Sequence, residues 1–161
     1  KGALFDGGEV FHAVKGCDAV LSALGGGTDG TDKTRSLGMK NILAQMQKAN
    51  VKRIIAIGGM GVLHADEDTL WMNTEDFPPE LKDVSQEHFV SYQLLKDTSL
   101  DWTFVCAPAI TDEGPTGSYS TNAGYLPEPN NNRSNSGDLA QFMLNELDRN
   151  EFIKERVGIS N

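Results

Sequence analysis

Three short apolar runs, each stopped by small residues or proline, constrain the fold of this chain more than any other feature. They cover residues 19–24, 53–57 and 102–106. An uninterrupted apolar run of this length favours a strand that is buried on both faces, as in a parallel sheet. Helical patterns separate the runs, at residues 32–50 and 86–98. Strands that alternate with helices predict an α/β fold with a doubly wound parallel sheet.

The rest of the chain extends this pattern at both ends. A short helix is expected at residues 9–15, a helix at 137–149 and a last strand at 156–159. Residues 60–85 are irregular, and residues 113–133 are rich in Gly, Pro and Asn and lack a helical period, so both segments are expected to be loops. Irregular segments of this length inside a compact domain are usually functional or mobile.

Length and composition place the 161 residues in one globular domain, with 39% hydrophobic and 23% charged residues. The formal net charge of −9 excludes nucleic acid and anionic membrane surfaces as expected partners, because both need clustered cations. No apolar run is long enough for a membrane span, and no signal peptide is recognisable. Cys17 and Cys106 lie far apart without metal-ligand spacing, so free thiols, a cytoplasmic location and no metal site are expected.

Small residues follow all three predicted strands. Right-handed crossovers between parallel strands place the ends of all three strands at one edge of the sheet. Ligands of such sheets bind at that edge, where turns without bulky side chains let a flat ligand approach the main chain. The residues predicted to contact a cofactor there are Leu24, Gly25, Gly26, Gly58, Gly59, Pro108, Ala109 and Ile110.

Several sequence segments occur together in a recognisable order. The first set is GCDAV at 16–20, LG at 24–25, GMKNI at 38–42 and NVKR at 50–53. The second set is PPEL at 78–81, His88, Leu100, Pro108, Ile110, TGSY at 116–119 and SGDLAQFML at 136–144. In this order they resemble the atypical short-chain dehydrogenases of the NmrA-like type, and most of all flavin reductase/biliverdin-IXβ reductase.

The resemblance implies a Rossmann-like fold and NADP or NAD as cofactor. The family begins with a strand, a GxxGxxG turn and a helix, and residues 1–161 contain no such motif. The resemblance therefore implies a domain that is incomplete at its N-terminus. It also places residues 2–5 at the end of the family's third strand, with Leu4 near the cofactor. A monomer acting on a small molecule is the family expectation.

Tyr92 and Lys96 form a Tyr-x-x-x-Lys pair on one face of a predicted helix. In classical short-chain dehydrogenases such a pair protonates a carbonyl oxygen, because the cation lowers the pKa of the phenol. Two interpretations stay open for Tyr92, a catalytic acid or a packing residue. Gly58 and Gly59 replace the Ser or Thr that usually completes the pair, and Ala109 stands where the flavin-reductase family tends to carry His.

For three other side chains, two interpretations stay open. His88, one turn before Tyr92, either approaches a substrate or lies on the helix surface. Trp71 and Phe77 either cover a flat substrate or anchor the 60–85 segment. The expected function is NAD(P)H-dependent reduction of a flavin-like or quinone-like acceptor. The alternatives are a redox-inactive NAD(P)-binding sensor of the NmrA-like type and a relative of sugar-nucleotide epimerases that uses Tyr92 and Lys96.

Overall fold

The computed structural model describes all residues from 1 to 161. Its helices are α1 (Gly7–Val14), α2 (Thr34–Ala49), α3 (Lys82–Lys96) and α4 (Ser136–Arg149). Its strands are β1 (Ala19–Ser22), β2 (Arg53–Gly59), β3 (Asp101–Ala107), β4 (Ala109–Thr111), β5 (Ser120–Ala123), β6 (Arg133–Asn135) and β7 (Glu155–Ser160). Short 3-10 turns lie at Met60–Val62, Trp71–Asn73 and Pro79–Leu81.

The central sheet has the strand order β1-β2-β3-β7-β5. β1 pairs with β2, β2 with β3 and β3 with β7, all in parallel. The three strands predicted from the apolar runs are therefore adjacent and parallel, as expected. β4 and β6 form a separate parallel pair beside the carboxyl end of β3.

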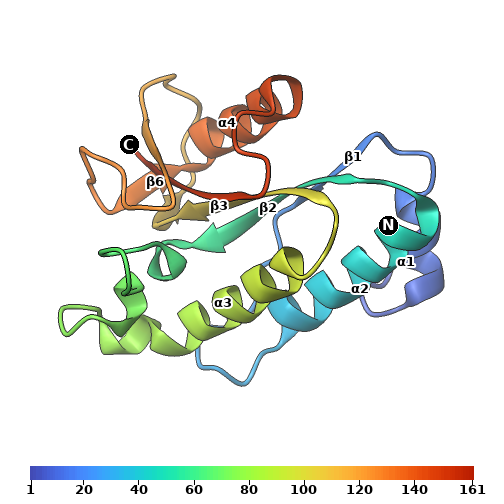
Figure 1. The fold of residues 1–161 in the computed structure, drawn as a ribbon, viewed down its shortest axis with the longest axis horizontal. Coiled ribbons are helices and arrows are strands. Elements are labelled where there is room, and N and C mark those ends of the chain that lie inside the picture. Colours follow the sequence, from blue (N-terminus) through green and yellow to red (C-terminus); the bar gives the residue numbers. More distant parts are fainter.

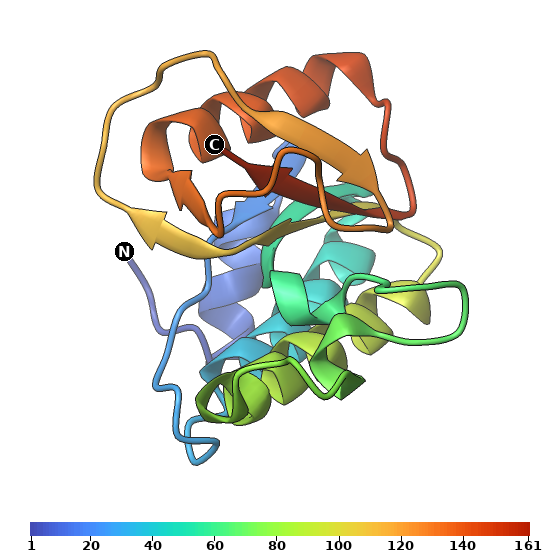
Figure 2. The ribbon, with the colours of Figure 1, turned by 90° about the vertical axis from the view of Figure 1, so that its left-hand side faces the viewer.

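Helices cover both faces of this sheet. α1, α2 and α3 lie on one face, and α4 lies on the other, as Figures 1 and 2 show from two directions. One buried cluster includes Met46, Ile54 and Phe104 on the three-helix side. A second cluster includes Val105 and Phe142 on the side of α4. This is the doubly wound α/β fold that the sequence predicts.

Local signals explain where the helices start and stop. Asp6 caps α1 by accepting a hydrogen bond from the Glu9 amide at 2.9 Å. Asn135 caps α4 in the same way. α2 and α4 each end at an asparagine in the left-handed region, Asn50 and Asn150, a conformation that asparagine tolerates better than most residues.

Two expectations about the fold are wrong. Residues 2–5 form no strand: Leu4 lies in a turn, its carbonyl accepts from the Asn41 side chain at 2.7 Å, and its side chain packs on Gly38 of α2. The 113–133 segment is also not wholly irregular, because β5 lies there and pairs antiparallel with β7. The sheet is therefore parallel except at this edge.

Two further observations concern the whole chain. None of its helices combines the length and the apolar character that a bilayer crossing requires. Cys17 is exposed and Cys106 is buried, and both are free thiols.

Candidate functional site

Two cavities open at the carboxyl edge of β1, β2 and β3. The first, which we call the loop cavity, has a volume of about 570 Å³ and lies between the end of β2, residues 71–81, α3 and residues 107–109. The second, which we call the edge cavity, has a volume of about 590 Å³ and lies between the ends of β1 and β2 and the helix α4. His88 of α3 lines both cavities, so it stands at their junction.

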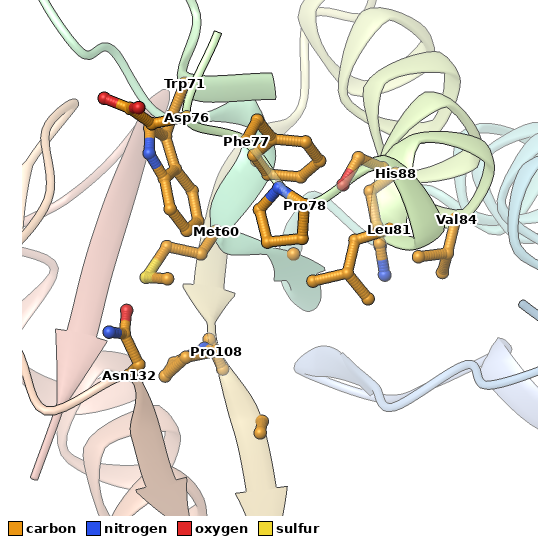
Figure 3. Close-up of a pocket in the computed structure, with 15 residues that line it drawn as sticks. Met60, Trp71, Asp76, Phe77, Pro78, Leu81, Val84, His88, Pro108 and Asn132 are labelled. Carbon is orange, nitrogen blue, oxygen red and sulfur yellow. The ribbon is translucent and has the colours of Figure 1, made fainter. Parts of the chain in front are cut away.

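Aromatic and apolar side chains form most of the loop cavity. The Trp71 and Phe77 rings meet edge to face, with centroids 4.9 Å apart. Phe77 is buried, and Met60 is buried beside it at the end of β2. Figure 3 shows Trp71, Met60 and Asn132 on one side of the cavity and His88, Leu81 and Val84 on the other. A space with such walls suits a flat, largely apolar molecule.

The His88 imidazole lies directly against the end of β2. A Cβ atom on Gly59 would come within 2.7 Å of the His88 Cδ2 atom, so a glycine is needed at position 59. No protein group is hydrogen-bonded to either ring nitrogen. Burial lowers the pKa of His88 to about 4, and the nearby Arg35 charge adds to the effect. The imidazole is therefore neutral at pH 7 and keeps one N–H to donate and one nitrogen to accept.

A buried network fixes α3 beside His88. The Glu87 carboxylate pairs with Lys33 Nζ at 3.0 Å and accepts a hydrogen bond from Ser36 Oγ at 2.7 Å. Burial alone works to raise the pKa of Glu87, but the hydrogen bonds from Ser36 and Lys33 outweigh it, and the pKa is lowered. Glu87 is therefore a charged group that ties α3 to the start of α2.

The turn after β1 is also held in place from α2. Arg35 donates from Nη1 to the Gly27 carbonyl at 2.8 Å and from Nη2 to the Gly26 carbonyl at 3.1 Å. Asp32 accepts from the Gly27 amide at 2.7 Å. Arg35 is buried and its Nε has no partner. The result is a fixed glycine turn with a guanidinium at the wall of the edge cavity.

The edge cavity fits part of a nicotinamide dinucleotide. A Cβ atom on Gly25 would meet nothing within 4 Å, so the main chain is open to a ligand there. Apolar side chains from β1, β2 and α4 line the cavity, and Arg35 supplies a positive charge that suits an anionic group. These residues would hold the ring system of the cofactor.

The structure brings together most of the residues predicted to bind a cofactor. Leu24, Gly25 and Ile110 line the edge cavity. Gly59, Pro108 and Ala109 line the loop cavity.

Three of the predicted residues line neither cavity. Gly26 faces the Asp32 carboxylate, and Gly58 faces the Phe104 ring. Leu4 packs on α2 as described above.

Tyr92 and Lys96 lie elsewhere. They line a third cavity of about 310 Å³, which shares no lining residue with the other two. The Tyr92 ring packs against Trp102 and Phe104 at centroid distances of 5.8 and 6.1 Å. The structure thus does not bring the Tyr-x-x-x-Lys pair together with Gly59 and Pro108.

Sequence reasoning missed Arg35 and Glu87, and it left the position of His88 open. Arg35 and Glu87 are charged residues on helices, which in most proteins lie in solvent. Their burial depends on contacts between α2, α3 and the turn after β1. No local pattern signals such contacts.

A mostly parallel sheet, with a fixed glycine turn and two cavities at its carboxyl edge, defines a Rossmann-like dinucleotide-binding protein. The family model described as NAD(P)H-binding matches residues 1–150. The chain belongs to this family, and its cofactor class is NAD(P)H.

Individual relatives are similar over most of the chain. The uncharacterised protein YwnB of Bacillus subtilis is 27% identical over 153 residues, which cover 91% of this chain and 71% of YwnB. A Burkholderia pseudomallei structure, named as a candidate exported protein, superposes with a TM-score of 0.86 at 29% identity, covering 99% of this chain and 79% of that one. A Streptococcus pneumoniae structure, named as a candidate NADH-flavin reductase, has a TM-score of 0.86 at 28% identity, covering 100% and 79%.

Proposed function

We propose that this protein is an NAD(P)H-dependent reductase of a flat acceptor, flavin-like or quinone-like. One observation carries the proposal: the edge cavity, which fits the cofactor ring, meets the aromatic loop cavity at His88. A hydride donor in the edge cavity and a flat acceptor in the loop cavity would lie side by side. The name of the Streptococcus pneumoniae relative supports the same chemistry.

The bound cofactor would supply the hydride, and the chain would position the acceptor and exclude water. Trp71 and Phe77 form an apolar wall for the acceptor ring. The neutral His88 imidazole donates a hydrogen bond to a ring nitrogen or carbonyl oxygen of the acceptor, where negative charge develops as hydride arrives. Reduction of a flavin needs little further acid catalysis, which agrees with the absence of Ser or Thr at positions 58 and 59.

The test is steady-state oxidation of NADPH and NADH with FMN or a naphthoquinone as acceptor. We expect turnover with at least one of these pairs. Trp71→Ala should raise the KM for the acceptor by about tenfold, since loss of an aromatic contact in a binding site is worth about 1–2 kcal/mol. Phe5→Ala is the matched control, because Phe5 is an exposed aromatic residue that lines none of the three cavities described above.

Two results would point to another function. Binding of NADPH without turnover of any acceptor would indicate a redox-inactive sensor, which the glycines at 58 and 59 also suit. Conversion of a sugar nucleotide without net oxidation would indicate an epimerase. The proposal also includes a small-molecule partner, a monomer and a cytoplasmic location, where NAD(P)H is supplied and thiols stay reduced.

A further inference from the structure

We propose that the third cavity is a binding site for a small oxyanion, either a phosphate or a carboxylate. The cavity has a volume of about 310 Å³ and lies between α3, the 64–70 segment and β7. We call it the Arg156 cavity after the residue that makes the strongest case for a ligand. The proposal is independent of the reductase function, since it concerns residues that line neither the loop cavity nor the edge cavity.

Arg156 of β7 is a buried cation without an anionic partner. Only 9% of its surface is exposed. The two salt bridges of the chain join Lys33 to Glu87 and Arg53 to Glu146, and neither includes Arg156. A buried charge that lacks a counter-charge is expensive, so such residues are usually paired or face a ligand.

The contacts of Arg156 leave part of its guanidinium free. Nη1 donates to the Val62 carbonyl oxygen, and the group stacks on the Tyr92 ring with its carbon 4.7 Å from the ring centroid. Nε and Nη2 have no hydrogen-bond partner in the protein, and the residue lines the cavity. Two N–H directions therefore remain for a ligand, and a fork of this kind matches the oxygens of a carboxylate or phosphate.

Arg53 of β2, whose side chain is 11% exposed, has an anionic partner within the protein although it also lines a cavity. Arg53 Nη2 bonds Glu146 Oε1 at 3.0 Å, and its Nε bonds the Asn150 side chain at 3.1 Å. The Glu146 carboxylate is itself buried. No carboxylate of the protein pairs with Arg156 in this way.

Other lining groups add to the same preference. Lys96 brings a second cation from the last turn of α3, and it is in no salt bridge. His64 lines the cavity with a buried Nδ1 that has no partner. Asp97 is the single carboxylate among the lining residues. The aromatic faces of Phe89 and Tyr92 complete the wall, so a small organic anion with an apolar part fits as well as inorganic phosphate.

In this proposal, Tyr92 and Lys96 of the Tyr-x-x-x-Lys pair contribute to anion binding rather than to acid catalysis. Its lysine would bind the anion, and its tyrosine ring supports the guanidinium of Arg156. Spacing alone placed the two residues on one helix face. The cavity shows that this face points to β7.

The experiment is isothermal titration of the full chain with sodium phosphate, sodium benzoate or sodium chloride, at constant ionic strength and pH 7. We expect saturable binding with one site for phosphate or for benzoate, and none for chloride. The oxyanion that binds with the lower Kd identifies the ligand class, phosphate or carboxylate. Lys96→Gln should weaken binding by about tenfold, as expected for loss of one charged hydrogen bond of about 1.4 kcal/mol.

Two further variants and one control complete the test. Arg156→Lys keeps the charge but loses the fork, and it should also weaken binding by about tenfold or more. His64→Asn tests the unpartnered nitrogen. Lys52→Gln removes an exposed cation from outside the cavity and should change nothing. If Arg156→Lys does not fold, Lys96→Gln still decides, because Lys96 is exposed and in no salt bridge. No saturable binding of either oxyanion, or equal binding by wild type and Lys96→Gln, would overturn the proposal.

Discussion

His88 and Tyr92 lie one turn apart on α3, yet they line different cavities. His88 packs on Gly59 at the end of β2, where the loop and edge cavities meet. Tyr92 packs on Phe104 and Arg156 and lines only the Arg156 cavity. The two residues therefore lead to opposite expectations for the reductase reaction.

Replacing His88 should impair reduction of the acceptor. In His88→Asn the shorter side chain cannot place its N–H group where the imidazole N–H lies. The hydrogen bond to the acceptor is then lost, and a hydrogen bond worth about 1–1.5 kcal/mol lowers kcat/KM about tenfold. Because the pKa of His88 is about 4, the imidazole stays neutral between pH 6 and 8. Protonation of His88 should therefore not change the kcat/KM of the wild type in this range. The measurement is kcat/KM against pH for both proteins. The matched control is Gln86→Ala, an exposed residue of the same helix. An unchanged kcat/KM in His88→Asn would exclude contact with the acceptor.

Replacing Tyr92 should matter much less. Tyr92→Phe keeps the ring that stacks on Phe104 and Arg156 and removes only the hydroxyl. We expect less than about tenfold loss of flavin turnover, below the 10²–10⁴-fold that general acid catalysis typically supplies. Steady-state NADPH oxidation with saturating flavin measures it. A loss of a hundredfold or more, with intact cofactor affinity, would show that Tyr92 is a true acid in spite of its distance from the edge.

The end of β2 depends on glycine for its packing. A Cβ atom on Gly58 would lie 2.3 Å from the Phe104 ring, which is fully buried and cannot move aside. Gly58→Ala should therefore lower the free energy of unfolding by about 1–3 kcal/mol, the usual cost of overpacking. Gly25→Ala is the control, since its Cβ atom would meet nothing within 4 Å. Urea unfolding of the three proteins measures both effects. Equal stability of Gly58→Ala and wild type would mean that β2 and β3 shift enough to accommodate the added methyl group without cost.

The predictability of each element follows from how local its signal is. The strands β2 and β3 were predictable because burial on both faces leaves an unbroken apolar run. β1 also has an apolar run, but it is the edge strand of the sheet and Leu21 is exposed, so the expected burial on both faces is wrong there. β5 was not predictable, because its sequence, Ser-Thr-Asn-Ala, is polar and mostly exposed and its pairing partner β7 lies far along the chain. α3 starts before its predicted start because a 3-10 turn at Pro79–Leu81 leads into it. Its buried Ser85, Glu87 and Ser91 also disguise the helical pattern.

The candidate site divides in the same way. The small residues at the strand ends were predictable, because parallel strands bring their carboxyl ends to one edge. The positions of Arg35, His88 and Arg156 were not. Each is set by the packing of one element on another, and the sequence near each residue contains no trace of it.

One buried carboxylate, that of Asp138, joins the last elements of the chain. Asp138 accepts hydrogen bonds from the amides of Thr116 and Gly117 at 2.8 and 2.7 Å. It also accepts from the side chains of Asn135 and Asn161, both at 2.7 Å. Burial works to raise the pKa of Asp138, but these hydrogen bonds hold it far below the ordinary value of 3.8. Asp138→Asn should destabilise the protein by at least about 2 kcal/mol at pH 7, because it removes the charge that all these donors share.

Stability should therefore fall with acid in two separate ranges. The pKa of His88 is lowered from 6.5 to about 4, so between these values the unfolded chain binds a proton that the folded protein does not. Stability is fully present above pH 6.5 and falls as the pH drops to about 4, by at most about 3–4 kcal/mol at about 1.4 kcal/mol per pKa unit. The pKa of Asp138 is lowered below 3.8, so its contribution is present above pH 3.8 and is lost only at lower pH.

Two variants separate these ranges. The free energy of unfolding is measured by urea titration at pH 7, 5.5, 4.5, 3.5 and 2.5. His88→Asn should flatten the curve between pH 6.5 and 4 and leave the decline below pH 3.8, because its amide does not titrate. Asp138→Asn should start from a lower stability, keep the first decline and reduce the second. His12→Asn serves as control for removal of a histidine outside both cavities. A wild-type curve that stays level from pH 6.5 to 4 would mean that the His88 imidazole reaches water, and it would then be free to protonate at the junction of the two cavities.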